Sequence, residues 1–184
     1  MRPVPLRLLT DRDHYEQVMT AVLDAKHSVW VATANLKDVM VEGPRVLRRR
    51  RSNFRSILEV FAELSTKGLD LRILHASMPS RAFRRSFDEL PELVGGGVQM
   101  RMCPRVHLKA VVVDAALLYL GSANWTGAGL GAKGDGRRNF EMGILTSDDQ
   151  MIDSVQERYD RIWRGAECGS CRLRQECELP LDRL

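Results

Sequence analysis

The chain has 184 residues, of which 44% are hydrophobic and 28% are charged, with a formal net charge of +4. A chain of this length and apolar content closes a hydrophobic core, which excludes disorder over most of it and favours a single domain. It contains no run of about 18 apolar residues, and its first residues lack an apolar signal core. We therefore expect a cytoplasmic protein that makes no contact with a membrane.

Helical and strand-like patterns alternate along the chain. Apolar residues at helical spacing predict a first helix between Leu6 and Lys26, and the β-branched run 28–34 predicts a buried strand. Residues 35–52 lack periodicity and indicate a long loop. Further helices are expected near 53–67, 81–93 and 148–164, the last capped by Ser147, and strands near 69–75, 98–102, 107–114, 117–122 and 139–145.

This alternation predicts an α/β fold in which a mixed β-sheet is flanked by helices on both faces. Residues 1–164 are expected to form the main domain. The polar residues 165–184, which we call the cysteine tail, are expected to form a short appendage that binds a metal and closes onto Cys103.

Two of the expected strands, 107–114 and 117–122, form a hairpin that carries polar side chains. Side chains two residues apart in a strand project to the same side, so His107 and Lys109 are expected to share one face. Gly121 has no side chain, which allows a phosphate or another backbone to come close to Ser122 and Asn124. Taken alone, a His-x-Lys pair also fits a solvated polar face.

The complete pattern is more specific than the pair, because it fixes six residue types at fixed spacing: His107-x-Lys109-x4-Asp114-x6-Gly121-Ser122-x-Asn124. It resembles the HKD motif of the phospholipase D superfamily. Downstream, Asn139-Phe140-Glu141 is similar to the Asn-x-Glu segment that follows the motif in that family. The resemblance spans residues 28–164 and implies a phospholipase D-like fold. In that family Asp114, at the far end of its strand, is expected to be structural rather than chemical.

The resemblance also implies an activity, that of a metal-independent phosphodiesterase acting through a covalent phosphohistidine. His107 would be the nucleophile, since neutral imidazole attacks near pH 7 without a metal-bound hydroxide. Lys109 and Asn124 would hold the non-bridging phosphate oxygens and offset their charge. Ser122 would add a hydrogen bond, and Glu141 would orient an imidazole by accepting from its other nitrogen. No cofactor is expected to take part in catalysis.

The family mechanism uses two histidines, because one attacks phosphorus while the other protonates the leaving oxygen. This chain supplies one motif. His14, His27 and His75 lack the downstream pattern and are expected to be ordinary surface or core residues. The resemblance to the small single-motif nucleases of the superfamily therefore implies a symmetric homodimer with the active site at its interface.

Arginine is concentrated beside the expected site. The residues expected to bind substrate are Arg48, Arg49, Arg50, Arg51, Arg137 and Arg138. Clustered arginine suits a polyanionic backbone, so we expect a nucleic-acid endonuclease, with DNA favoured over RNA. A solvated charge run remains an alternative for the first four. The alternative functions are a phospholipid phosphodiesterase and a nucleic-acid-binding module with an inactive site. Trp125 or Phe140 is either a stacking platform or part of the core.

The cysteines are unevenly placed, with Cys168-x2-Cys171-x5-Cys177 in the tail and Cys103 four residues before His107. Two thiolates separated by two residues grip one metal ion, and reducing conditions disfavour disulfides. We expect these four residues to bind a structural metal centre. The spacing resembles the iron–sulfur staple of RecB-like nucleases, which favours a [4Fe-4S] cluster, with zinc as the alternative.

Overall fold

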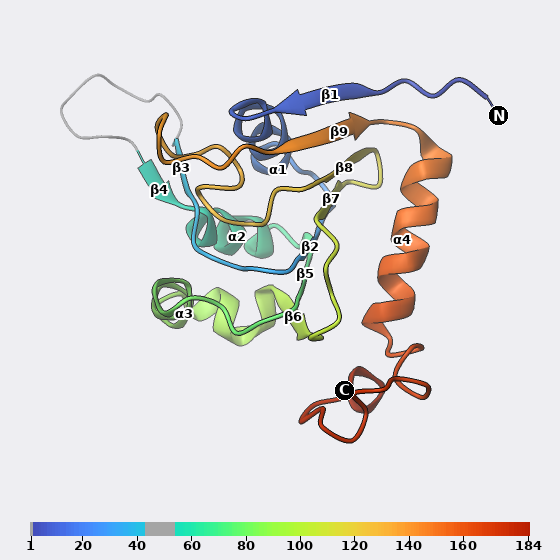
Figure 1. The fold of residues 1–184 in the computed structure, drawn as a ribbon. Helices are drawn as coiled ribbons and strands as arrows, with labels where there is room; N and C mark the ends of the chain where they lie inside the picture. The colour runs from blue at the N-terminus through green and yellow to red at the C-terminus, as the bar shows by residue number, and fades with distance from the viewer. Residues whose placement is uncertain (1, 43–53) are drawn as a thin grey trace.

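The computed structural model describes residues 2–42 and 54–184. Within them lies a seven-stranded mixed sheet in the order β1-β9-β8-β7-β2-β5-β6 (Figure 1). Its strands are β1 (Arg7–Thr10), β2 (Ser28–Thr33), β5 (Asp70–His75), β6 (Gln99–Met102), β7 (Ala110–Val113), β8 (Leu117–Gly121) and β9 (Met142–Thr146). Strands β2, β5 and β6 run parallel, and the remaining neighbours are antiparallel. A separate antiparallel ribbon pairs β3 (Met40–Glu42) with β4 (Phe54–Ser56).

Helices cover both faces of this sheet, which confirms the predicted fold class. A helical segment His14–Met19 continues into α1 (Thr20–Leu23), and the later helices are α2 (Ile57–Thr66), α3 (Arg81–Asp88) and α4 (Asp149–Trp163). One core joins the sheet to α1, α2 and α3, and includes Phe61 stacked on Trp125. On the opposite face α4 packs through Tyr159 and Trp163 (Figure 1). None of the helices in the described ranges is long and apolar enough to cross a membrane.

The first predicted element is wrong at its start. Residues Arg7–Thr10 form an edge strand that pairs with β9, and helix begins only at His14. Leu9 is fully buried whereas Leu8 is 61% exposed, so this segment alternates with the period of a strand. This alternation covers only four residues, so in the sequence it is a weaker signal than the helical spacing of the apolar residues that follow it.

The central hairpin is shorter than predicted. Strand β7 begins at Ala110, so His107 and Lys109 lie in the segment that enters the strand rather than inside it. Likewise β9 begins at Met142, just after Glu141. The cap of α4 is Asp148, whose side chain accepts a hydrogen bond from the Met151 N–H at 3.0 Å, and not Ser147. The long loop predicted at 35–52 contains β3 in its described part.

Candidate active site

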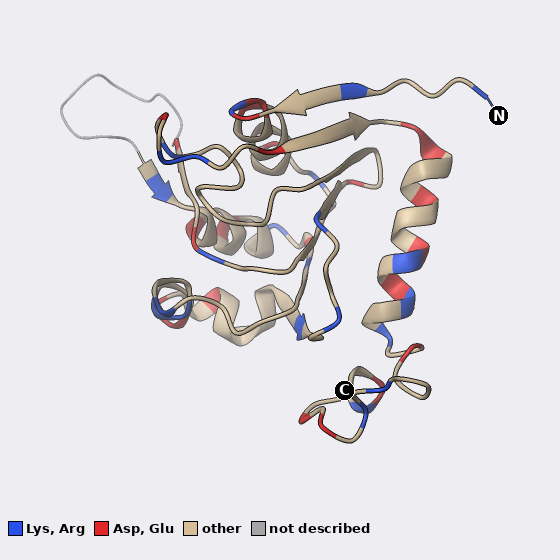
Figure 2. Cartoon of the chain, in the orientation of Figure 1, with Lys and Arg blue, Asp and Glu red and all other residues tan. Residues whose placement is uncertain are grey.

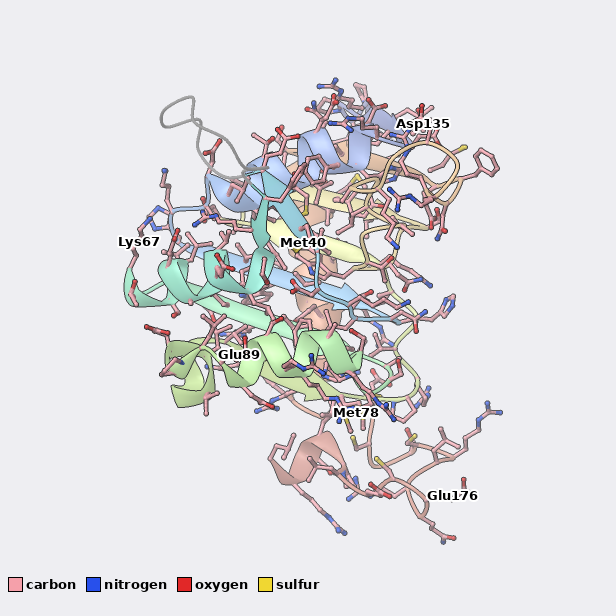
Figure 3. The ribbon with its side chains drawn as sticks, turned by 90° about the vertical axis from the view of Figure 1, so that its left-hand side faces the viewer. Met40, Lys67, Met78, Glu89, Asp135 and Glu176 are labelled. Atoms are coloured by element: carbon pink, nitrogen blue, oxygen red, sulfur yellow. The ribbon has the colours of Figure 1, made fainter. Side chains whose placement is uncertain are left out.

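The sheet topology brings the predicted catalytic residues to one end of the sheet. Strand β7 runs antiparallel to β2 with Ala110 opposite Ala32, so the start of β7 lies beside the end of β2. Gly121, at the end of β8, pairs with Gly143 near the start of β9. His107, Ser122 and Glu141 therefore come from three neighbouring strand ends. Figure 3 shows Met78, Asp135 and Glu176 on this same side, opposite Lys67 and Glu89.

His107 and Lys109 are in contact at this end of the sheet. The Lys109 Nζ lies 3.0 Å from each ring nitrogen of His107 and donates to the His107 carbonyl oxygen at 2.9 Å. Because the ammonium is equally far from both nitrogens, it sits against the imidazole rather than being directed at one nitrogen. Burial lowers the pKa of Lys109, and the nearby Glu141 carboxylate acts in the opposite direction. His107 itself is exposed, so a substrate reaches its ring from solvent.

Asn124 is oriented by the end of β2. Its side-chain carbonyl oxygen accepts hydrogen bonds from the backbone N–H groups of Ala34 and Asn35, each at 3.1 Å. With the oxygen held by the backbone, the amide NH2 group is the part of Asn124 that remains to donate to a ligand. The sequence identified Asn124 but not these two partners, because they lie about 90 residues earlier in the chain.

Ser122 and Glu141 form a short polar network across β8 and β9. The Ser122 hydroxyl hydrogen-bonds to the Glu141 carboxylate and accepts from the Met142 N–H at 3.1 Å. The other carboxylate oxygen accepts from the Asn139 side-chain amide at 3.0 Å. Among the described residues no hydrogen bond joins Glu141 to His107 of the same chain, so orientation of an imidazole by Glu141 remains a prediction.

Asp114 lies at the opposite end of β7 and binds backbone. Its carboxylate accepts from the N–H groups of Lys26, His27 and Ser28 at 2.7–3.1 Å. Burial by itself raises the pKa of Asp114, but the hydrogen bonds from these three amides outweigh burial and hold the pKa below its ordinary value. A structural role agrees with this position, which ties the N-terminal end of β2 to the hairpin turn.

The two aromatic side chains near the motif differ sharply in environment. Trp125 is buried and stacked on Phe61, so it belongs to the core. Phe140, next to Glu141, is 99% exposed. Of the two rings, only that of Phe140 is therefore open to contact by a ligand.

Of the predicted substrate-binding arginines, Arg48, Arg49, Arg50 and Arg51 lie outside the described residues. Arg137 and Arg138 lie in the loop that precedes β9, which Figure 2 shows as a basic segment. Arg138 is half-buried and forms an ion pair with Asp135, whereas Arg137 is exposed. The two adjacent arginines, both predicted from the sequence to bind substrate, therefore differ in exposure and in ion pairing.

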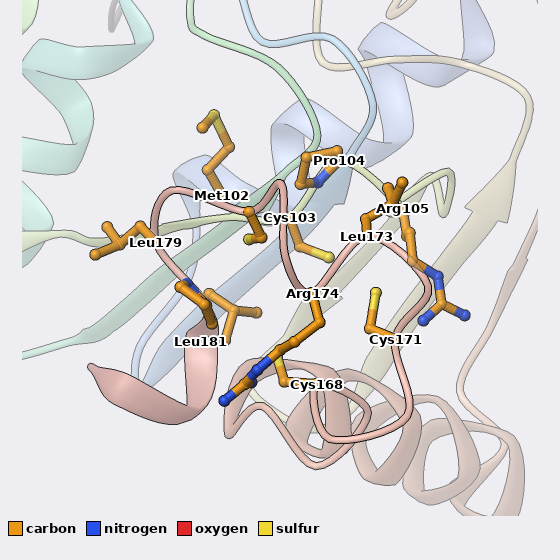
Figure 4. Close-up of a pocket in the computed structure, with 12 residues that line it drawn as sticks. Met102, Cys103, Pro104, Arg105, Cys168, Cys171, Leu173, Arg174, Leu179 and Leu181 are labelled. Carbon is orange, nitrogen blue, oxygen red and sulfur yellow. The ribbon is translucent and has the colours of Figure 1, made fainter.

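The four cysteines line one small pocket between the sheet and the tail (Figure 4). Each is half-buried, and each is a free thiol. As these side chains stand, no three His, Cys, Asp or Glu residues in 2–42 and 54–184 are placed to hold one metal ion together. Arg105 and Arg174, which the sequence did not single out, line the same pocket. The backbone N–H of Leu173 and the Arg105 guanidinium lower the pKa of Cys171.

With the fold and site in place, comparison with known proteins gives the class: a phospholipase D-like domain. Residues 18–163 match the family described as cardiolipin synthase, PLD-like domain. This covers most of the chain, and the protein belongs to that family.

Several known proteins are similar to this chain. The mitochondrial cardiolipin hydrolase of Chlamydomonas reinhardtii is 28% identical over 107 residues, which cover 58% of this chain and 45% of that protein. The chain thus spans under half the length of this curated relative.

Solved structures share the fold. NucT from Helicobacter pylori matches with a TM-score of 0.60 and 15% identity, covering 86% of this chain and 95% of its own. Nuc from Salmonella typhimurium, a phospholipase D family member, matches with a TM-score of 0.61 and 16% identity, covering 88% of this chain and 95% of its own. TrmBL2, an archaeal chromatin protein with a novel mode of DNA binding, matches with a TM-score of 0.55 and 10% identity, covering 86% of this chain and 52% of its own.

Proposed function

We propose that this protein is a phosphodiesterase that cleaves nucleic acid through a covalent phosphohistidine formed on His107. The observation that carries the proposal is the convergence of an exposed imidazole, an ammonium group 3.0 Å from its nitrogens, and the oriented side chain of Asn124 at one end of the sheet. An imidazole paired with donors suits attack on a phosphodiester, whose transition state carries charge on its oxygens.

The reaction runs in two displacements. A lone pair of a His107 ring nitrogen forms a bond to phosphorus as the bond to the leaving oxygen breaks, and a general acid gives that oxygen a proton. Water then attacks phosphorus, the bond from phosphorus to nitrogen breaks, and the water loses a proton to the same group. Lys109 and the Asn124 amide donate to the non-bridging oxygens throughout.

The general acid is best supplied by a second copy of the chain. His14 and His75 are buried, at 0% and 5% exposure, so neither reaches a substrate beside His107. His27 lies at the other end of β7, where its N–H donates to Asp114. The sequence has four histidines. The second imidazole is therefore His107 of the partner subunit in a symmetric dimer, for which the exposed position of His107 leaves room.

Charge and aromatic surface support a nucleic-acid substrate. Arg137 is exposed in the loop before β9, and the bare ring of Phe140 follows three residues later. Arginine neutralises a phosphate backbone, and a solvent-facing aromatic ring stacks on unpaired bases whatever their sequence. A single-stranded or locally open substrate is the form that offers such bases.

A phospholipid is the second candidate substrate, because the curated relative is named a cardiolipin hydrolase. Cleavage of single-stranded DNA, duplex DNA, RNA and cardiolipin vesicles, each with a chelator present, separates the candidates. His107→Ala is the negative control, and Ser170→Ala, an exposed change in the tail, is the matched control. Turnover of nucleic acid lost in His107→Ala supports the proposal. Turnover of lipid alone contradicts it, and binding of DNA without any turnover indicates an inactive binding module.

Mixing of subunits tests the shared site. If the site lies between two copies and needs His107 from each, a mixed dimer of wild-type and His107→Ala subunits is inactive, so activity should fall with the square of the wild-type fraction rather than in proportion to it. Activity that stays proportional to protein concentration down to a monomeric state, shown by light scattering, would contradict a site built from two chains.

A further inference from the structure

We propose that Cys103, Cys168, Cys171 and Cys177 bind one zinc ion, which fastens the cysteine tail to the segment that carries His107. All four side chains line a single pocket, although one of them comes from a part of the chain 65 residues or more before the others. Four cysteines are a complete ligand set for structural zinc, which takes four ligands in a tetrahedron.

The backbone around these cysteines already has the turns that such a site uses. The Cys171 N–H donates to the Cys168 carbonyl at 3.2 Å, which closes a four-residue turn across the C-x2-C pair. The Val106 N–H donates to the Cys103 carbonyl at 2.9 Å, which closes a second turn beside it. Figure 4 shows Cys103 and Cys171 facing the space between these two turns.

The charges around the pocket suit a thiolate site. Four thiolates around one divalent ion leave excess negative charge, which is costly in a half-buried place unless cations lie nearby. Arg105 and Arg174 line the same pocket. Arg174 also forms an ion pair with Asp182 at 2.6 Å, so part of its charge is already offset and Arg105 is the main counter-charge at this pocket.

The size of the pocket favours a single ion over a cluster. The volume open to the centres of water molecules is about 30 Å³, and since about 10–15 Å³ of such volume holds one water, the pocket has room for only a few. A [4Fe-4S] cluster brings eight heavy atoms into the same space and requires the walls to open. A single ion requires only that the four sulfurs draw together, since no three of them yet stand close enough to hold one ion jointly. Residues 165–180 contain turns rather than regular helix or strand, which leaves them free to close in this way.

Closure of this site acts on the catalytic segment through packing. Cys103 and Cys168 pack against the core cluster that contains Val106 and Leu181. Val106 is buried directly before His107, and Leu181 is buried near the end of the tail. The ion therefore holds one wall of the cluster in which the His107 segment is anchored, a positioning role that leaves the chemistry to His107 and Lys109.

Metal analysis of the purified full chain tests the proposal. We expect about one zinc per chain, retained on gel filtration and lost in each single Cys→Ser variant at these four positions. Ser170→Ala, inside the same turn, should keep its zinc. After a chelator has removed the zinc from the wild-type protein, added cobalt should give the strong visible bands of a tetrahedral thiolate site. Added zinc should then displace the cobalt and remove the bands.

Thiol labelling keeps the test independent of how the variants fold. In the wild-type protein zinc should protect all four cysteines from alkylation, read by mass spectrometry, and a chelator should expose all four together. Protection of fewer than four thiols, a disulfide between any two of them, or a chain free of metal after growth with zinc would overturn the proposal. Iron with acid-labile sulfide would overturn the choice of zinc. Each outcome is independent of phosphodiesterase activity.

Discussion

The hydroxyl of Ser122 hydrogen-bonds to the carboxylate of Glu141, linking the end of β8 to the start of β9. The same hydroxyl accepts a hydrogen bond from the Met142 N–H, so Ser122 connects the two strand ends that form this part of the site. Glu141 meets Ser122 on one oxygen and Asn139 on the other. These contacts hold the negative charge of Glu141 near Lys109, and this charge acts to raise the pKa of the ammonium group.

Glu141→Gln should slow cleavage without unfolding the protein. The amide keeps its hydrogen bond with Ser122 but removes the charge that favours protonated Lys109, so the fall in Lys109 pKa is no longer opposed. We expect kcat to fall by about 10-fold or more and the alkaline limb of the pH profile to move to lower pH. An unchanged alkaline limb would show that Glu141 does not act on Lys109.

Asn124→Asp should preserve the fold and abolish cleavage. A carboxylate still accepts from the Ala34 and Asn35 N–H groups, but it replaces the donor NH2 with a negative oxygen that repels a phosphate. We expect loss of activity of about 100-fold or more, with a melting temperature near that of the wild-type protein. Asn124→Ala loses the backbone contacts as well and should melt lower. Wild-type turnover in Asn124→Asp would remove Asn124 from the site.

Asp114→Asn should destabilise the fold in a way that depends on pH. The Asp114 pKa is lower in the folded protein, so its contribution to stability is present above the unfolded carboxyl pKa of about 3.9 and is lost as the pH falls through the folded pKa. At neutral pH the substitution should cost about 1–3 kcal/mol, since hydrogen bonds to a charged group are replaced by weaker ones. Denaturant unfolding of both proteins at neutral and acidic pH measures this. A difference that stays constant as the pH falls would contradict the assigned role, and cleavage per folded molecule should be unchanged.

Gly121→Ala should destabilise the sheet beside the site. A Cβ atom at this position would lie 2.8 Å from the Gly143 Cα on the paired strand and would meet the Tyr119 hydroxyl. Backbone on a neighbouring strand cannot move aside without breaking the pairing, so we expect a loss of about 1–3 kcal/mol. Gly134→Ala is the matched control, because a Cβ there has no neighbour within 4 Å and the residue is exposed. Equal melting temperatures for the two variants would contradict the close approach.

Much of the fold was predictable because its signals are local. The β-branched run at 28–34 and the apolar periodicity of 53–67 each mark an element within about fifteen residues, and the elements are present as β2 and α2, although residues 54–56 form strand β4 and the helix begins at Ile57. Strand β1 was not predictable in this way. Its four residues become a strand because β9, more than 130 residues later, offers an open edge with which to pair.

The amino-acid sequence by itself determined which residues belong to the candidate site, because the motif fixes types and spacing along one hairpin, and it determined that four thiols are available. Only the tertiary structure decided how those residues meet. It tied the Asn124 oxygen to the end of β2, paired Arg138 with Asp135, and left Phe140 in water while Trp125 went into the core. It also brought Cys103 to the tail cysteines. The physical reason is that exposure and hydrogen-bond partners depend on strands that pair across long stretches of chain, and no spacing within a single segment encodes that pairing.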